Sequence, residues 1–207
     1  MTLRIVMSLV ALLAFPFIVV AQESRVYVGG TLNFVTQTHS DTEPIGGTTQ
    51  GGSALFGVQV SPRVAIEFEP SLAGRYSWRY TYRPSPSLTA NVVASRRDTF
   101  FPIQARIRFG AVEPVVGVAF VHSRISRHAT VGSATYFDDS RSDGNLAFVG
   151  GVDAALNLAP HFYVVPTFRV LVSAPGATPD SPGDPLGAQT STGSLGFRYG
   201  AGARVAF

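Results

Sequence analysis

Two glutamates, Glu67 and Glu69, stand two positions apart, which is the spacing of neighbours on one face of a β-strand. Paired carboxylates can serve as general acid and base when their surroundings separate their pKa values. The alternative is an ion-pair network with arginines, because an unpaired charge is very costly in a poorly hydrated interior. We expect the network, and we extend it to Asp153. Its expected members are Glu67, Glu69, Arg75, Arg106, Arg108, Asp153, Arg169, Arg198 and Arg204.

A second candidate site consists of His122, Ser123 and His128, the residue types found at the surface sites of barrel enzymes that deacylate lipid A. A nucleophilic serine needs a base within hydrogen-bond reach. Adjacent residues of a strand point to opposite faces, so His122 cannot readily serve Ser123. We therefore expect polar residues at an interface here, and no catalytic site.

Three aspartates, Asp138, Asp139 and Asp143, supply oxygen atoms of the kind that bind Ca²⁺. The segment 137–144 lacks the full ligand spacing of a calcium loop, so we expect a solvated acidic loop and no metal. The glycine pairs at 29–30, 46–47 and 150–151 precede no helix and do not form a phosphate-binding loop. The chain has no cysteine, which excludes disulfides and thiolate sites. We expect no cofactor.

The element that positions these residues is the amphipathic β-strand. In the segment 193–207 every second residue from Leu195 to Phe207 is apolar, and small or cationic residues lie between them. This period of two predicts a strand with one apolar face. Similar alternation predicts eight strands in all, at 25–36, 53–60, 64–82, 98–109, 115–127, 145–158, 162–173 and 193–207.

Short and long connections alternate between these strands. The short turns lie at 61–63, 110–114 and 159–161, and the long polar loops at 37–52, 84–97, 128–144 and 174–192. That asymmetry is typical of outer-membrane barrels. A soluble lipocalin-like barrel also has eight strands, but its apolar face is turned inward. The terminal Phe207 and the aromatic residues on the apolar face favour the membrane barrel.

Composition supports this interpretation. Residues 1–21 have the positive, apolar and small-residue regions of a cleaved signal peptide, which leaves one domain at 22–207. No later apolar run is long enough for a transmembrane helix, although 45% of the residues are hydrophobic. Apolar residues are instead dispersed, as in a barrel wall. The formal net charge is +3 without a basic cluster, so we expect no nucleic-acid partner.

The pattern resembles the transmembrane domain of outer-membrane protein A and its small relatives, including outer-membrane protein X and the opacity-type adhesins. The resemblance is carried by the segments 151–153, 159–161 and 168–169, which are similar to the family's Gly-x-acid, turn-proline and aromatic-arginine spacing. It implies an all-β fold, an eight-stranded antiparallel transmembrane barrel in the bacterial outer membrane with both termini periplasmic. The chain ends with the barrel, so a peptidoglycan-binding domain is not expected.

The resemblance also implies roles for the wall. The C-terminal strand, with Tyr199, Val205 and Phe207, corresponds to the signal that the barrel-assembly machinery recognises. Aromatic residues at two heights are expected to contact outer-membrane lipid as girdles. These residues are Phe34, Tyr76, Trp78, Phe101, Phe109, Phe148, Phe162 and Phe197. Uninterrupted alternation across 64–82 puts Tyr76 and Trp78 outside and Arg75 inside.

The function expected from these observations is structural or adhesin-like, with loops presented to an unidentified extracellular ligand. The alternative is a narrow, porin-like conduit for small solutes, and the third possibility is a lipid A-modifying enzyme. A conduit requires a continuous uncharged lumen, whereas the inward residues here include both Arg and Glu.

Deleting Phe207 tests the expected assembly signal. Because the alternation continues to the last residue, Phe207→Ala or deletion of Phe207 should lower outer-membrane levels far more than any single loop substitution. Immunoblots of outer-membrane fractions measure this. Normal levels of the deletion variant would contradict the assigned role of the terminal residue.

Overall fold

The structure is a computed structural model, and it describes residues 26–38, 47–173 and 195–207. The predicted signal peptide at 1–21 lies outside the described residues, as do residues 39–46 of the predicted loop at 37–52 and the whole of the predicted loop at 174–192. Among the described residues no helix is long and apolar enough to cross a membrane.

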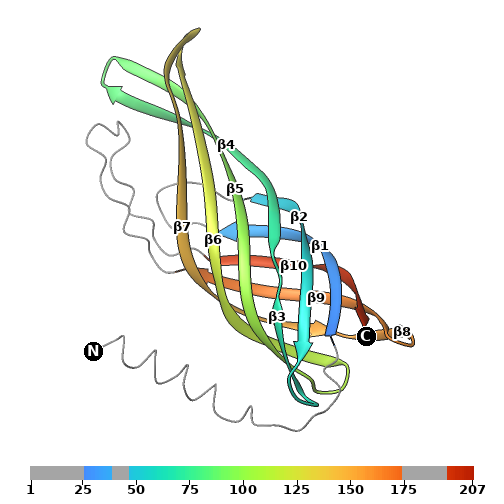
Figure 1. The fold of residues 1–207 in the computed structure, drawn as a ribbon. Helices are drawn as coiled ribbons and strands as arrows, with labels where there is room; N and C mark the ends of the chain where they lie inside the picture. The colour runs from blue at the N-terminus through green and yellow to red at the C-terminus, as the bar shows by residue number, and fades with distance from the viewer. Residues whose placement is uncertain (1–25, 39–46, 174–194) are drawn as a thin grey trace, which may run out of the picture.

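The described chain is a single antiparallel sheet of ten strand segments (Figure 1). The segments are β1 (Val26–Thr38), β2 (Gly47–Gln59), β3 (Val64–Phe68), β4 (Ser71–Ser85), β5 (Leu88–Ile107), β6 (Val112–Val131), β7 (Ala134–Ala154), β8 (Leu156–Ala159), β9 (Phe162–Ser173) and β10 (Leu195–Ala206). β3 and β4 occupy one position, because both pair with β2 and β5. β7 and β8 occupy another position, because both pair with β9.

The sheet closes into a ring of eight strand positions. β1 pairs with β2 on one side and with β10 on the other, so the first and last strands meet. The backbone N–H of Phe207 also donates to the carbonyl of Val26 at 2.9 Å. Closure leaves the ring without an unpaired strand edge, which a bilayer interior demands. The prediction of an eight-stranded antiparallel barrel is confirmed.

The wall is apolar outside, and its inner face combines buried charges with a buried apolar cluster that includes Val35, Phe100 and Leu171. Exposed fractions on the outer face reach 80% for Leu32, 71% for Phe148 and 69% for Leu146, whereas Glu67 and Arg106 are each 1% exposed. In the predicted strand 115–127, alternation puts Val116, Val118 and Phe120 on one face together with His122 and Arg124, so the sequence does not say which face is outside. The structure places that face outside. The outer face is therefore the one suited to lipid, and the lumen holds the charges.

Two hairpins continue past the ring (Figure 1). β9 last pairs with β7 at Ser173↔Ala147, and β2 last pairs with β4 at Gly51↔Ala73. Beyond those points β4 to β7 pair only with one another in the described part of the chain. We call this four-stranded extension the projecting sheet; it comprises residues 75–85, 88–97, 124–131 and 134–142. The prediction of irregular loops at 84–97 and 128–144 is therefore wrong.

A β-bulge interrupts β4 where it leaves the ring. Leu72 pairs with Thr99 and Arg75 with Arg97, so Ala73 and Gly74 together face the single residue Asp98. An extra residue moves every following side chain to the opposite face. Arg75 is consequently exposed, and Tyr76 is 5% exposed with its hydroxyl 3.3 Å from the carbonyl of Val35. The prediction of an inward Arg75 and an outward Tyr76 is corrected; the side chain of Trp78 lies outside the described residues.

Candidate functional site

The lumen of the ring holds a cluster of buried charges. Four carboxylates and four guanidinium groups, each no more than 2% exposed, lie there: Glu67, Glu69, Glu113, Asp153, Arg106, Arg169, Arg198 and Arg204. They come from β3, the β3–β4 junction, β5, β6, β7, β9 and β10. Alternation alone explains their common orientation, since each occupies an inward position of its strand. We call this set the lumen network.

Arg106 is the centre of the lumen network. Its Nε and Nη2 donate to both oxygens of Glu67 at 2.5 and 2.8 Å. Its Nη1 lies 2.7 Å from Glu113 and 2.6 Å from Asp153. The planar guanidinium fork matches a carboxylate bidentately, and a lysine could not hold three carboxylates in this way.

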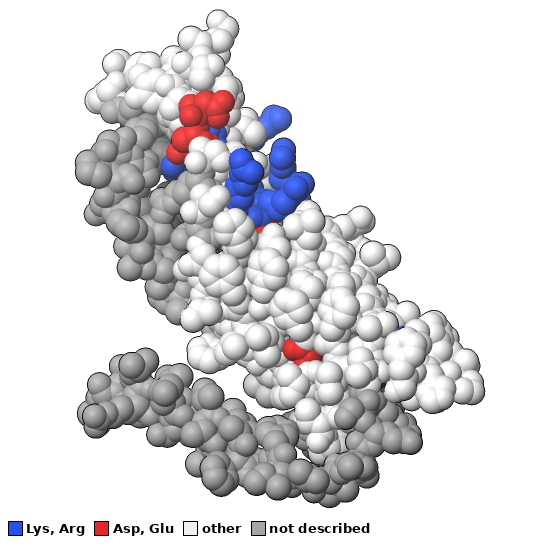
Figure 2. Space-filling model, viewed as in Figure 1, with Lys and Arg blue, Asp and Glu red and all other residues white. Residues whose placement is uncertain are grey.

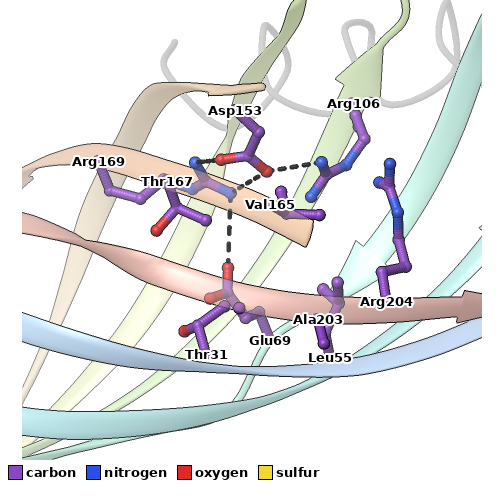
Figure 3. A pocket seen from close by; sticks show the side chains of 11 residues that line it. Thr31, Leu55, Glu69, Arg106, Asp153, Val165, Thr167, Arg169, Ala203 and Arg204 are labelled. Carbon is purple, nitrogen blue, oxygen red and sulfur yellow. Dashed lines mark hydrogen bonds and ion pairs between the residues drawn. The ribbon is translucent and has the colours of Figure 1, made fainter. Parts of the chain in front are cut away.

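Arg169 and Arg198 bind the other two acids. Both terminal nitrogens of Arg169 donate to Asp153, and Nη2 lies 3.7 Å from Glu69 (Figure 3). Arg198 reaches Glu69 from β10 at 2.7 Å and donates to Ser71 Oγ at 2.8 Å. β10 and the β3–β4 junction are not neighbours in the ring, so this ion pair crosses the lumen.

Arg204 crosses the lumen as well, from β10 to β6, where its Nη1 lies 2.9 Å from Glu113. Its guanidinium stands over the rings of Tyr27 and Tyr163, 5.1 and 5.3 Å from their centroids. The hydroxyl of Tyr27 donates to Glu67 at 2.5 Å. Two aromatic faces and the carboxylate of Glu113 therefore hold the cation.

Inward glycines make room for these long side chains. A Cβ on Gly57 would collide with the ring of Tyr27, and one on Gly151 would lie 2.8 Å from Cδ of Arg169. Both glycines pair directly with the residue that they accommodate. The absence of a side chain on the neighbouring strand thus lets Tyr27 and Arg169 lie along the wall.

The space left between the side chains is small. A cavity of about 10 Å³ is lined by Thr31, Glu69, Asp153, Thr167 and Arg169, among others. That is close to the smallest space that holds one water. Thr167 Oγ1 and Arg169 Nε are buried there without a hydrogen bond to the described residues, so we expect one ordered water between them.

The predicted network and the structure differ in three members. Arg75 lies outside, as described above. Arg108 is at the rim, with a 28% exposed side chain that contacts Glu113 at 3.3 Å and Gln59 at 3.0 Å. Glu113 belongs to the network although the sequence placed it in a turn. Glu113 lies two residues before Val115, which is buried. The period of two therefore extends the strand back to Glu113.

Glu67 and Glu69 have no access to substrate. Glu67 accepts from Tyr27, Gln104 and Arg106, and Glu69 accepts from Ser53 and Gln104 and pairs with Arg198. A general acid must reach the proton that it transfers. Both carboxylates are instead bound by fixed hydrogen-bond donors, so their role is structural.

The His122–Ser123 pair is divided by the wall. His122 is exposed on the outer face, whereas Ser123 is 5% exposed and donates to Asp98 at 2.6 Å inside. Arg96 completes this inner cluster, 2.7 Å from Asp98 and 3.0 Å from Ser123. His122 and Ser123 therefore cannot act as base and nucleophile on one substrate.

The acidic segment lies on β7 of the projecting sheet. Asp139 pairs with Arg127 at 2.5 Å, and Asp138 lies 3.6 Å from His128. The side chain of Asp143 lies outside the described residues. Among the described residues no group of three or more His, Cys, Asp or Glu side chains is arranged to hold a metal ion.

The remaining predicted aromatic residues lie on the outer face. Phe34, Phe101, Phe109, Phe148 and Phe162 are 36–71% exposed. Phe34 stacks on Tyr199 with ring centroids 5.7 Å apart, and Phe197 lies 6.3 Å from Phe168. At the end of β10, Val205 is partly exposed and Phe207 is 73% exposed. Apart from Tyr76 and Trp78, the residues expected to face lipid do face outward.

Comparison with known proteins identifies the fold. No protein-family model and no curated protein matches this sequence. The structure is similar to that of Ail, the attachment invasion locus protein of Yersinia pestis, with a TM-score of 0.54 and 10% identity over 90% of this chain and 100% of Ail. Ail in complex with the heparin analogue sucrose octasulfate gives a TM-score of 0.51, 9% identity and the same coverage.

Neisserial surface protein A gives a TM-score of 0.43 and 14% identity, over 88% of this chain and 97% of that chain. At such low identities the likeness to Ail shows the fold alone. This chain has the fold of the small outer-membrane β-barrels.

Removing one acid tests the lumen network. Glu67→Ala leaves Arg106 and Tyr27 without their shared acceptor, and the loss of one partner of a buried pair costs about 3–5 kcal/mol. We expect the free energy of unfolding in lipid vesicles, measured by urea titration, to fall by that amount. Asp138→Ala, which removes an exposed acid from the projecting sheet, is the matched control and should change little. Equal losses in the two variants would contradict the network's structural role.

Proposed function

We propose that this protein is a surface-presenting barrel of the bacterial outer membrane, with a closed lumen and the projecting sheet as its contact surface. The observation that carries the proposal is the combination of cross-lumen ion pairs with strands that continue beyond the ring. A transport channel keeps its lumen open, whereas this chain fills it with eight paired charges. The rigid ring then serves to hold the projecting sheet in place.

The orientation belongs to the same proposal. In outer-membrane barrels the short turns lie on the periplasmic side and the long connections outside. The connections at 60–63, 108–111 and 160–161 are short, and the two long hairpins leave the opposite end of the ring. Both termini are then periplasmic after removal of residues 1–21, and the C-terminal strand, with Phe207 at its end, meets the barrel-assembly machinery from that side.

The conduit remains the second candidate, because one observation favours it. A hollow of about 910 Å³ on the wall is lined by Gly30, Thr31, Gly52, Pro70 and Gly202, among others. Thr31 and Gly202 also line the small lumen cavity, so the wall between the two spaces is thin. A hydrogen bond between Thr31 and Ser53 and one from Ser53 to Glu69 close it.

Single-channel recording in planar bilayers separates the two functions. We expect no steady conductance from the unmodified barrel, because eight strands enclose a space that side chains fill. Arg106→Ala removes the central guanidinium and should produce a small leak, whereas Arg63→Ala in the exposed turn should not. Both variants must first show the heat-dependent gel shift of a folded barrel. A large, steady conductance from the unmodified protein would overturn the closed-lumen proposal.

Cysteine labelling tests the orientation without background, because the natural chain has no cysteine. A membrane-impermeant maleimide should label Ser87→Cys and Ser133→Cys, at the hairpin turns, in intact cells. Ala111→Cys, in the exposed turn at the other end, should react only after the outer membrane is opened. The reverse pattern would place the projecting sheet in the periplasm.

A further inference from the structure

Three arginines form a row across the outer face of the wall, at the base of the projecting sheet. Arg75 on β4 pairs in register with Arg97 on β5, and Arg97 pairs with Arg124 on β6. All three side chains are exposed. Residues directly opposite on one face have Cβ atoms about 4.5–5.5 Å apart, and like charges at that spacing repel.

No acid of the described chain neutralises this arginine row. Within the described residues none of the three takes part in an ion pair, whereas Arg127, on the inner face of the same sheet, pairs with Asp139 at 2.5 Å. The next outward row towards the hairpin turns contains no acid either. It consists of serines paired in register, namely Ser77, Ser95, Ser126 and Ser140. A row of cations beside a row of hydroxyl groups is a surface that favours an oxyanion.

The height of the arginine row is defined by the apolar wall below it. Phe101 and Phe120 pair on the outer face and are 40% and 46% exposed. Each stands four residues below an arginine of the row, Arg97 and Arg124 respectively. Four residues of a strand tilted by 35–45° rise about 10 Å. Aromatic residues mark the membrane interface, and the headgroup layer is roughly 5–8 Å thick. The backbone of the row therefore lies just above the headgroups, and the long arginine side chains reach down to them.

The space-filling view shows the same order of layers. Basic side chains gather on the upper part of the visible face, with acidic side chains above them and a broad band that is almost free of charge below (Figure 2). Thr99 and His122 form the one row between the aromatic pair and the arginines. The change from apolar to cationic surface is therefore complete within two rows.

We propose that the arginine row, with the serines above it, binds the phosphate groups of a phosphorylated glycolipid in the outer leaflet. The proposal rests on the orientation proposed above, with the projecting sheet outside. Arginine forks bind phosphate bidentately, and hydroxyl groups donate to the remaining oxygens. The bulge in β4 brings Arg75 into the row. Arg97 on β5 and Arg124 on β6 reach the same face by regular alternation.

A lipid fits this surface better than a free polyanion. The arginines lie directly above the lipid-facing wall, where a bound acyl chain packs on Phe101 and Phe120 while its headgroup contacts the row. A soluble glycan would gain nothing from that apolar surface. The serine row is in position for sugar hydroxyl groups, so the ligand class is a glycolipid that carries phosphate.

Binding is measured with the purified barrel, refolded in a nonionic detergent, by fluorescence anisotropy of labelled lipid A that carries two phosphates. The test variant is R75Q/R97Q/R124Q. A basic residue near a membrane surface contributes about 5-fold in affinity, so the three together predict roughly a 100-fold loss. Added salt should weaken binding to the unmodified barrel. The Arg→Lys triple variant keeps the charge and should retain part of the affinity.

A matched pair of double variants separates the effect of the arginine row on binding from the effect of net charge. R97Q/R124Q and R63Q/R83Q each remove two exposed arginines, and only the first should weaken binding. All variants must show the heat-dependent gel shift, which reports folding, and a closed lumen in bilayers. If R97Q/R124Q loses lipid binding while its lumen stays closed, the result supports the lipid site. It does so independently of the proposed surface-presenting function.

Three results would overturn the proposal: equal losses in the two double variants, equal affinity for lipid A stripped of its phosphates, or displacement of lipid A by free pyrophosphate at the lipid's own concentration. Heparin is a further competitor. Heparin binding that depends on the row and exceeds lipid A binding would instead make the surface a sulfated-glycan site.

Discussion

The constraint on which this structure depends is that charge inside a narrow barrel must be paired. The charged residues of the lumen network are at most 2% exposed, so a lone carboxylate or guanidinium there would lose its hydration without compensation. Glu67, Glu113 and Asp153 converge on Arg106, and Glu69 is shared by Arg169 and Arg198. The contacts of Arg106 with Asp153 and of Glu69 with Arg169 and Arg198 join parts of the ring that are not neighbours in the sheet. The same pairs that satisfy the charges therefore also hold the ring shut across its lumen.

The regular part of this arrangement is predictable from sequence, because the pleat fixes a period of two. Alternation places Glu67, Arg106 and Arg204 inside and Phe101 and Phe148 outside without knowledge of any contact. It cannot say which acid meets which arginine, since that depends on the register between strands far apart in the chain. It also places Glu113 in a turn, because Gly110 and Pro114 suggest a longer connection than the two residues that the ring uses.

The projecting sheet shows where composition misleads. Proline and serine between 84 and 97 suggest an irregular loop, yet β5 runs through most of this segment. The inward residues Ala90, Val92 and Ala94 are at most 1% exposed, so the period of two was present but carried by small side chains. Pairing with β4 and β6 outweighs the weak strand propensity of the segment, because propensity for strands depends on neighbours more than on the residue itself.

The bulge at Ala73 and Gly74 is invisible to pattern analysis and has the largest consequence. It changes the face of every later residue of β4, so Tyr76 enters the mouth of the lumen while Arg75 joins Arg97 and Arg124 outside. β5 pairs with β6 through this level without a register shift. One extra residue in β4 thus determines both which side chain enters the lumen and which one lies on the outer surface. Without it Arg75 would lie near the buried Arg96–Asp98–Ser123 cluster, and Tyr76 would replace an arginine between hydrophobic wall and projecting sheet.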